Sequence, residues 1–203
     1  MASHPKHHYT PAEYLALERT APYKNEYCYG EIFAMSGASR EHNIITLNVA
    51  TLFNNQLEAR DCEVYASEMR VRIPATNVYA YPDVVVVCGE PQFEDDCFDT
   101  LLNPTLIVEV LSPSSEKHDR TKKFADYRRI ASLGEYVMIA QQECRVSQYL
   151  TQSESPWLFQ EASSLSETIS LVSIDCQLSL ESGYRRIQFP SNHDSILPVE
   201  AAL

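Results

Sequence analysis

Two acidic side chains stand beside or within continuous apolar runs, where an uncompensated charge is costly. Asp83 precedes four valines in the segment Pro82–Cys88, and Glu109 lies within the segment Leu106–Leu111. Because β-branched residues fit a pleated sheet, such runs predict strands that are covered on both faces. A buried carboxylate is strongly unfavourable unless it is paired or bound to a metal ion. Two of them favour a shared divalent cation, as in a metal-dependent phosphodiesterase; solvated or ion-paired positions at strand ends are the alternative.

A candidate cationic group follows these two acids, in a helix predicted over residues 116–132. Lys123 and Tyr127 are four residues apart and therefore neighbours on adjacent turns of this helix. The lysine could reach over the strand ends towards the two acids. A surface ion pair with Asp119, four residues earlier and worth about 0.3–0.5 kcal/mol, is its alternative role.

Two further polar residues are weaker candidates. Glu26 lies in a stretch, residues 25–35, that predicts two short strands turning at Gly30, and it could point towards a site. More often such a glutamate is solvated. His42 falls in the first turn of a long helix predicted from Ser39, a position that suits a group facing an anion, although a surface histidine is the commoner case.

A possible basic face precedes the Asp83 strand. Arg70 and Arg72 alternate with Met69, Val71 and Ile73, which predicts a strand with one apolar and one basic face. The two arginines could contact phosphates. Salt bridges to an acid-rich surface are an equally plausible explanation.

The composition is ordinary for one globular domain of 203 residues, with 44% hydrophobic and 22% charged content. The formal net charge of -12 argues against a general nucleic-acid coat, but it leaves room for a local basic groove. We expect residues 1–9 to be a flexible N-terminus, residues 10–189 to form a single domain, and residues 190–203 to be an irregular tail. The chain has no run of about 20 apolar residues, so no membrane association is expected.

Six cysteines are scattered along the chain without a CxxC pair or histidines spaced for zinc. Two of them lie in strand-like runs. We therefore expect reduced thiols in a cytoplasmic protein, where they mostly fill the core.

An ordered set of motifs resembles a known family. The sequence contains Asn-Glu-Tyr-x-x-Gly-Glu-Ile, a histidine opening a long helix, Tyr-Pro-Asp-Val-Val-Val-Val, Ile-Val-Glu-Val-Leu-Ser-Pro-Ser, Asp-x-x-x-Lys-x-x-x-Tyr and Gly-x-Tyr-Val. In this order, over about residues 10–150, they resemble the Uma-type endonuclease family, a branch of the PD-(D/E)xK nuclease superfamily. The resemblance implies an α/β fold, a restriction endonuclease-like mixed β-sheet core flanked by helices.

The resemblance also implies a metal site and a catalytic lysine. Asp83 and Glu109, with the backbone carbonyl of Val110, would bind Mg²⁺ or Mn²⁺, which prefer oxygen ligands. The superfamily usually has a lysine two residues after the second acid, where this chain has Leu111. In this branch a lysine on the following helix, here Lys123, would take its place.

The remaining candidates also match family positions. Tyr127 completes the lysine motif, and Glu26 and His42 would position water or contact the metal ion indirectly. The implied function is metal-dependent hydrolysis of DNA phosphodiester bonds, with DNA as the substrate. Separately, the negative net charge is compatible with a symmetric homodimer that pools two local basic patches. A catalytically inactive module of the same fold, which binds or assembles, is the alternative function.

Overall fold

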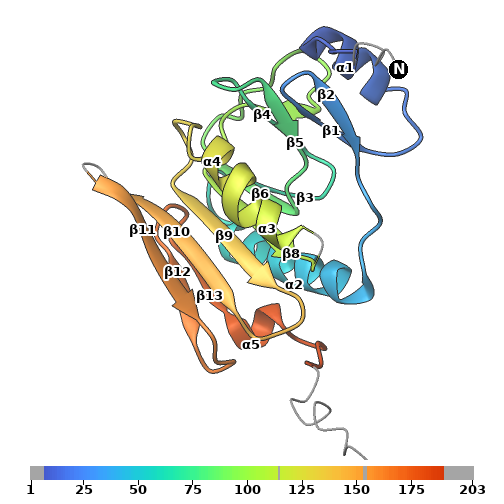
Figure 1. Cartoon of the computed structure of the whole chain (residues 1–203). Coiled ribbons are helices and arrows are strands. Elements are labelled where there is room, and N and C mark those ends of the chain that lie inside the picture. Colours follow the sequence, from blue (N-terminus) through green and yellow to red (C-terminus); the bar gives the residue numbers. More distant parts are fainter. Residues whose placement is uncertain (1–6, 114, 153–154, 190–203) are drawn as a thin grey trace, which may run out of the picture.

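The protein is described by a computed structural model that covers residues 7–113, 115–152 and 155–189. Its centre is a six-stranded mixed sheet (Figure 1). In pairing order its strands are β11 (Ser155–Ala162), β10 (Val146–Gln152), β9 (Glu135–Ala140), β8 (Leu106–Leu111), β6 (Val84–Cys88) and β3 (Cys62–Ala66). Strand β8 pairs antiparallel with β6 and parallel with β9.

Two smaller sheets accompany the central one. The five-stranded sheet has the order β2 (Glu31–Ala34), β1 (Asn25–Cys28), β5 (Val78–Ala80), β4 (Arg70–Ile73) and β7 (Thr100–Leu101). The two-stranded sheet consists of β12 (Thr168–Leu171) and β13 (Cys176–Ser179). The helices are α1 (Pro11–Glu18), α2 (Arg40–Leu57), α3 (Glu116–His118), α4 (Phe124–Tyr127) and α5 (Leu180–Gly183), with a π-helical turn over Asp119–Lys123.

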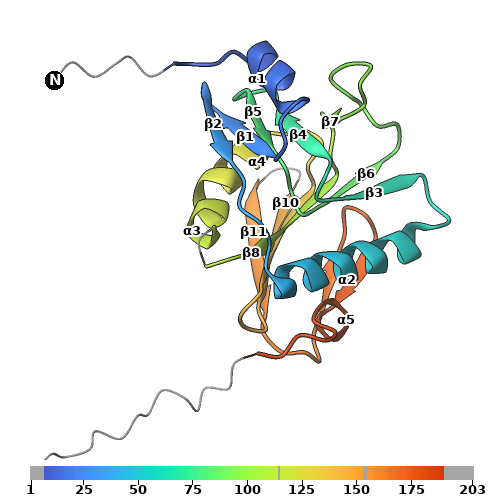
Figure 2. The same cartoon turned by 90° about the vertical axis from the view of Figure 1, so that its right-hand side faces the viewer.

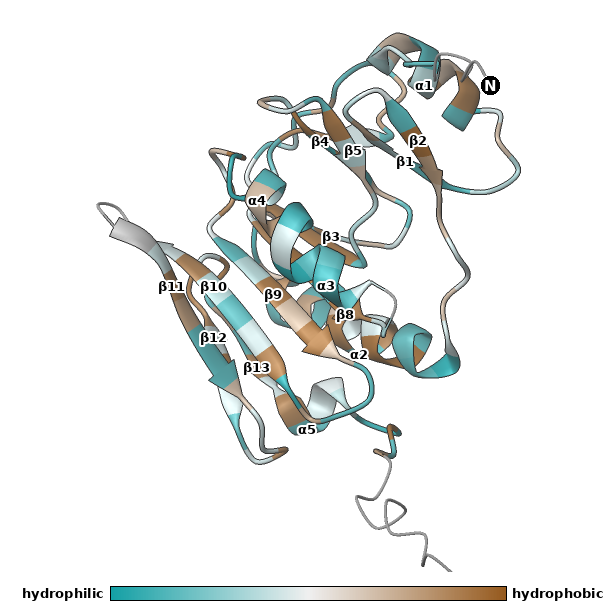
Figure 3. Cartoon of the chain, in the orientation of Figure 1, coloured by the Kyte–Doolittle hydropathy of each residue, from teal (hydrophilic) through white to brown (hydrophobic). Residues whose placement is uncertain are grey.

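The central sheet is covered on both faces, as the run of four valines predicts. Val84 and Val86 pack in one core with residues of α2, α5, β12 and β13, whereas Val85 and Val87 pack in a second core with residues of β4, β5 and α4. None of the four is more than 1% exposed. Figure 2 shows α2 and the α3–α4 segment on different sides of the sheet. In Figure 3 the segment around α3 is largely hydrophilic, and hydrophobic residues gather in the strands behind it.

The helix starts agree with the local sequence. Thr10 and Glu13 form a reciprocal capping box at α1, and the hydroxyl of Ser39 accepts a hydrogen bond from the backbone amide of His42 at the start of α2. These caps satisfy amide groups that have no partner within the helix. The cap of α2 thereby fixes the first turn of the helix and the direction in which the side chain of His42 projects from it.

The segment with alternating arginines divides between two sheets. Strand β3 ends at Ala66, Ser67 adopts a positive φ of 59°, and β4 begins at Arg70 in the five-stranded sheet. Arg70 is only 2% exposed and pairs with Asp99 at 2.9 Å, while Arg72 pairs with Glu94 at 2.6 Å. The salt-bridge explanation of these arginines is therefore the correct one.

The expectation that all cysteines are reduced is wrong for one pair. Cys62 and Cys88 form a disulfide between β3 and β6, where they stand directly opposite each other with Cα atoms 4.0 Å apart. Their sequence separation of 26 residues means that the bond restricts the unfolded chain, a contribution of about 3–4 kcal/mol to stability. The other cysteines, Cys28, Cys97, Cys144 and Cys176, are free.

The expected boundaries of the domain, at residues 10 and 189, can be compared with the structure only in part. Residues 1–6 and the predicted irregular tail, 190–203, lie outside the described part of the chain. Tyr9 lies within it, and its amide donates a hydrogen bond to the carbonyl of Gly30. Within the described residues, none of the helices has the length and apolar character needed to cross a membrane.

Candidate active site

The two acidic candidates are cross-strand neighbours. Val84 of β6 pairs with Val108 of β8 in an antiparallel register, so extending that register by one residue places Asp83 opposite Glu109. Side chains at directly opposed positions share a face of the sheet, with Cβ atoms about 4.5–5.5 Å apart. Their side chains are 14% and 5% exposed respectively. Two carboxylates therefore lie close together at the edge of the core.

Asp83 is held by two groups from different elements. Its Oδ2 atom accepts a hydrogen bond of 2.7 Å from the backbone amide of Val110 and lies 3.2 Å from Nε2 of His42. Because the Ser39 cap fixes the first turn of α2, His42 faces this carboxylate rather than bulk solvent. The orientation of Asp83 is thus set by β8 and α2 together.

Lys123 brings a positive charge to three other carboxylates. Its Nζ atom lies 3.0 Å from Glu26, 3.1 Å from Glu109 and 3.7 Å from Asp119. The lysine side chain is 12% exposed, and the three acids are between 3% and 14% exposed. The ion pair between Lys123 and Asp119 exists, but the expectation that it lies on the surface is wrong, because both side chains are largely buried in this cluster.

A π-helical turn carries Lys123 to this position. The amide of Phe124 donates to the carbonyl of Asp119, five residues earlier, and the hydroxyl of Thr121 donates to the carbonyl of Lys117. A hydroxyl bonded to the carbonyl four residues back competes with the helical backbone pattern. An extra residue in one turn rotates all later side chains by about 100° relative to a continuous α-helix. The helical segment begins at Glu116, as predicted, but it ends at Tyr127 and not at the predicted residue 132.

Buried tyrosines support the acids from below. The hydroxyl of Tyr127 donates to Oε1 of Glu109 at 2.9 Å, the same oxygen that Lys123 approaches. Tyr136, on β9, donates to the backbone carbonyl of Asp119 at 3.2 Å. On the opposite side, Glu26 accepts a hydrogen bond from the amide of Tyr81 at 3.2 Å. The carboxylates of Glu109 and Glu26 are therefore each oriented by a specific donor, and the backbone of Asp119 is anchored to β9.

Negative charge exceeds positive charge in this cluster. Burial, followed by the neighbouring carboxylates of Asp119, Asp83 and Glu26, raises the pKa of Glu109 well above its ordinary 4.5, although Lys123 opposes the shift. Burial also raises the pKa of Asp119. Burial acts against a charged lysine, yet the surrounding acids hold the pKa of Lys123 well above its ordinary value. The cluster therefore retains its ammonium and favours an additional proton or another cation.

A pH-dependent stability follows from the raised pKa of Glu109. Between pH 4.5 and that raised pKa, the folded protein binds more protons than the unfolded chain, so stability falls as pH rises. We expect the wild type to lose up to about 1.4 kcal/mol per pH unit in this window relative to Glu109→Gln, which lacks the titrating group. Urea unfolding of both proteins across this pH range measures the difference. A difference that does not change with pH would contradict the expectation.

The cluster opens into a cleft of about 650 Å³ whose lining includes Glu26, His42, Asp83, Glu109, Val110, Asp119 and Lys123. Five of the six predicted catalytic side chains line this cleft. The sixth, Tyr127, adjoins it through its hydrogen bond to Glu109. Of Val110, the structure shows the amide bound to Asp83, whereas the metal-binding role of its carbonyl stays a prediction. Leu111, at the place of the superfamily's usual lysine, is 2% exposed and packs in the core.

The oxygen donors of the site fit a hard divalent cation whose remaining ligands are water molecules or substrate phosphate. Asp83 and Glu109 offer carboxylate oxygens from adjacent strands, which suit Mg²⁺ or Mn²⁺. Over the described residues, no group of three His, Cys, Asp or Glu side chains is arranged to hold a metal ion. Mg²⁺ commonly binds through one or two carboxylates and completes its shell with water and substrate phosphate. The two acids fit that mode of binding.

Sequence reasoning missed two features of the site. It considered Asp119 only as the partner of Lys123 in an alternative surface ion pair, although this carboxylate is buried beside Lys123 in the site. It also did not predict the π-helical turn. The one available signal was Thr121, because a threonine hydroxyl can bond to a helical carbonyl in competition with the backbone amides.

The fold is that of a nuclease-like class of proteins. A crystal structure of a protein described as “a putative nuclease belonging to DUF820”, from Anabaena variabilis, aligns with a TM-score of 0.72 over 87% of this chain and 97% of that one. The sequence identity of this alignment is 18%, so it establishes the fold, a restriction endonuclease-like mixed sheet flanked by helices.

The sequence places the chain within a particular family. The model of the Uma2 family, described as “Putative restriction endonuclease”, matches residues 11–181, and the chain belongs to this family. An uncharacterized protein of Synechocystis sp., sll1609, is 41% identical over 152 residues, covering 75% of this chain and 86% of the relative. A second one, slr1290, is 34% identical over 180 residues, covering 89% and 93%. The expected family resemblance is confirmed.

Proposed function

We propose that this protein is a divalent-metal-dependent endonuclease that hydrolyses phosphodiester bonds of DNA. The observation that carries the proposal is the meeting of Asp83, Glu109 and Lys123 in one cleft. Asp83 directly precedes β6, Glu109 lies in β8, and Lys123 ends the π-helical turn. Membership of a family described as “Putative restriction endonuclease” agrees with it. The proposal assigns chemistry to this cleft rather than to any other part of the fold.

Each side chain has a definite task in the proposed reaction. Asp83 and Glu109 would hold the ion, which would polarise a phosphate oxygen and lower the pKa of a water molecule. Lys123 places its ammonium where negative charge develops on the phosphate, and Glu26 keeps that ammonium in position. His42 and the amide of Val110 keep the Asp83 carboxylate in one orientation.

The surface near the cleft can accept the DNA backbone despite the net charge of -12. Lys117, His118 and Lys122 are exposed on the segment that carries Lys123. Phosphate contacts by lysine supply affinity that depends on salt concentration rather than on base sequence. A local basic strip beside an acidic cluster is the charge arrangement expected for a metal-dependent enzyme acting on a polyanion.

A direct assay tests the function. Purified protein is incubated with supercoiled plasmid, linear duplex and single-stranded DNA in Mg²⁺ or Mn²⁺, with a chelator as control. We expect cleavage of at least one of these DNA forms that the chelator abolishes. Cleavage of the same extent in the chelator would remove the metal-dependent part of the proposal.

A catalytically inactive binding module is the second candidate. The arrangement that favours it is the engagement of Glu109 by both Lys123 and Tyr127, together with the missing group of three metal-binding side chains among the described residues. This alternative predicts neither cleavage of any DNA form nor binding of Mn²⁺ in equilibrium dialysis. Observing both would exclude it.

A further inference from the structure

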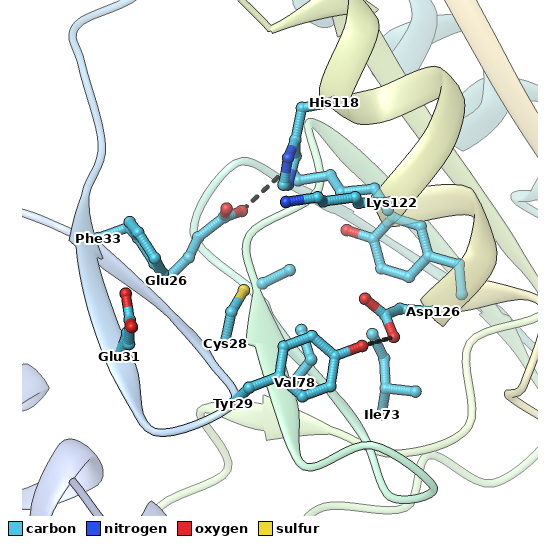
Figure 4. A pocket seen from close by; sticks show the side chains of 13 residues that line it. Glu26, Cys28, Tyr29, Glu31, Phe33, Ile73, Val78, His118, Lys122 and Asp126 are labelled. Atoms are coloured by element: carbon cyan, nitrogen blue, oxygen red, sulfur yellow. Dashed lines mark hydrogen bonds and ion pairs between the residues drawn. The ribbon is translucent and has the colours of Figure 1, made fainter. Parts of the chain in front are cut away.

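A second cavity adjoins the cleft, and the proposed reaction does not use it. It has a volume of about 460 Å³ and lies between the β1–β2 hairpin and the helical segment that carries Lys123 (Figure 4). Glu26, His118 and Lys123 line both this cavity and the cleft. A ligand that fills the cavity would therefore extend directly to the cluster of acids.

The cavity has an apolar floor and an aromatic rim. Its floor includes Ile73, Val78 and Ala80, each no more than 3% exposed. Its rim includes Tyr29 and Phe33, which are 63% and 50% exposed. Large aromatic side chains left accessible beside an apolar hollow are typical of surfaces that stack a planar ring.

Tyr29 occupies a backbone position that is unfavourable for it. Cys28 pairs with Glu31, so Tyr29 and Gly30 form a two-residue hairpin loop, with φ angles of 53° and 92°. Such a loop requires positive φ at both positions and strongly favours Asn-Gly or Asp-Gly. Turn geometry alone does not explain a tyrosine here, and strained residues of this kind cluster at functional sites.

The side chain of Tyr29 reaches across the mouth of the cavity. Its hydroxyl donates a hydrogen bond of 2.6 Å to Oδ1 of Asp126 in the short helix α4 (Figure 4). This bond fixes the ring beside the cavity instead of leaving it free to rotate. The ring is therefore oriented before any ligand arrives, which lowers the entropic cost of binding.

The lining of the cavity favours a base, and the lysines on its helical side favour the phosphate attached to that base. The floor and rim offer apolar and aromatic surface, together with acceptor oxygens of Tyr29 and Asp126. The cationic groups of Lys122 and Lys123 lie on the helical side, which continues into the cleft. A phosphate is disfavoured next to carboxylates, whereas a base presents amino groups and a ring that suit this lining.

From these features, and on the basis of the proposed nuclease function, we propose that the cavity holds one unstacked nucleobase of the DNA substrate next to the bond that is cut. The substrate class is then DNA with an unpaired base, such as a single strand or a frayed end. Extracting a base from intact duplex is costly, and the cost is least when the base is already unpaired.

Photocrosslinking tests this proposal independently of cleavage. A single-stranded oligonucleotide containing 5-iododeoxyuridine is irradiated with the full chain at low salt in the presence of a chelator, so that no metal-dependent reaction occurs. Mass spectrometry is expected to find the adduct on Tyr29 or Phe33. Adducts confined to other residues, or no adduct, would overturn the proposal.

Two variants of Tyr29 separate stacking from the hydrogen bond. Tyr29→Asn suits the turn better but removes the ring, and it should weaken single-strand binding roughly tenfold or more. Tyr29→Phe keeps the ring and should retain most of the affinity. Equal binding by Tyr29→Asn and the wild type, or an equal loss in both variants, would contradict a stacking role. Thermal unfolding checks that both variants are folded.

The outcomes distinguish this inference from the proposed function. An adduct at the rim without any metal-dependent cleavage would refute the nuclease and leave a cavity that binds a base without cutting the DNA. Metal-dependent cleavage together with unchanged binding by Tyr29→Asn would refute the base site alone. Fluorescence anisotropy of a matched duplex supplies the comparison, since the proposal expects at least tenfold weaker binding of fully paired DNA than of the single strand.

Discussion

Glu109→Gln is expected to reduce the rate of DNA cleavage by about 100-fold to 1,000-fold, a loss typical of removing one electrostatic group from an active site. The variant keeps the shape of the side chain and an oxygen that can accept the hydrogen bond of Tyr127, but it removes the negative charge. Asp83→Asn should have a similar effect, because it also removes a carboxylate charge from the site, while its remaining oxygen can still accept the hydrogen bond of the Val110 amide. Cleavage of the DNA form that the wild type cuts, at a fixed Mn²⁺ concentration, measures both losses.

A matched control is available on the neighbouring strand. Glu135, on β9, is also fully buried, and burial also raises its pKa, but it accepts hydrogen bonds from Gln148 and Ser173 away from the cleft. Glu135→Gln makes the same chemical change, so cleavage by the folded fraction should remain within a few-fold of the wild type. If Glu109→Gln, folded by circular dichroism, cleaved as fast as this control, the assignment of Glu109 would be wrong.

The sequence predicts the strands of the site well because burial leaves a clear signature in composition. Four consecutive valines have no polar face, so only a strand covered on both sides explains them, and β6 is covered in this way. The same reasoning identifies the carboxylate of Glu109 as an exception that needs a compensating group. That group is Lys123, which the structure places 3.1 Å away.

Contacts that depend on register or on helix irregularity could not be predicted. Cys62 and Cys88 become partners only once β3 and β6 pair in one particular register, which their spacing of 26 residues does not reveal. An Asp and a Lys four residues apart fit an exposed helix as well as a buried cluster. The burial of Asp119 therefore depends on the π-helical turn and on Tyr136 beneath it.

One part of the fold left a signal that the sequence analysis did not use. Ile169 and Leu171, and then Cys176 and Leu178, alternate with exposed residues, the pattern of two half-buried strands. These residues form β12 and β13 and help to cover the α2 side of the central sheet. The site lies on the other side, with Glu109 between Ile107 and Leu111, so missing the hairpin did not affect the prediction of the site.

Lys123→Met is expected to cost about 3–5 kcal/mol of unfolding free energy at neutral pH, the usual effect of leaving buried charges without their partner. Methionine has nearly the same length but no charge, so Glu26, Glu109 and Asp119 would face one another uncompensated. The variant should also lose most of its cleavage. Urea unfolding, with the exposed Lys117→Met as the control for stability, measures the cost.

The pH and cation dependence of the Lys123→Met variant distinguish electrostatics from packing. Lys123 opposes the raised pKa of both Glu109 and Asp119, so without the ammonium the pKa of these two acids should rise further. The variant should therefore be stabilised as pH falls, since protonation then relieves the repulsion. Mn²⁺ should stabilise the variant more than the wild type, because the ion restores positive charge to the same carboxylates. If neither lower pH nor Mn²⁺ recovered stability, lost packing of the lysine stem would explain the defect, and Lys123 would have no part in balancing the charge of a metal site.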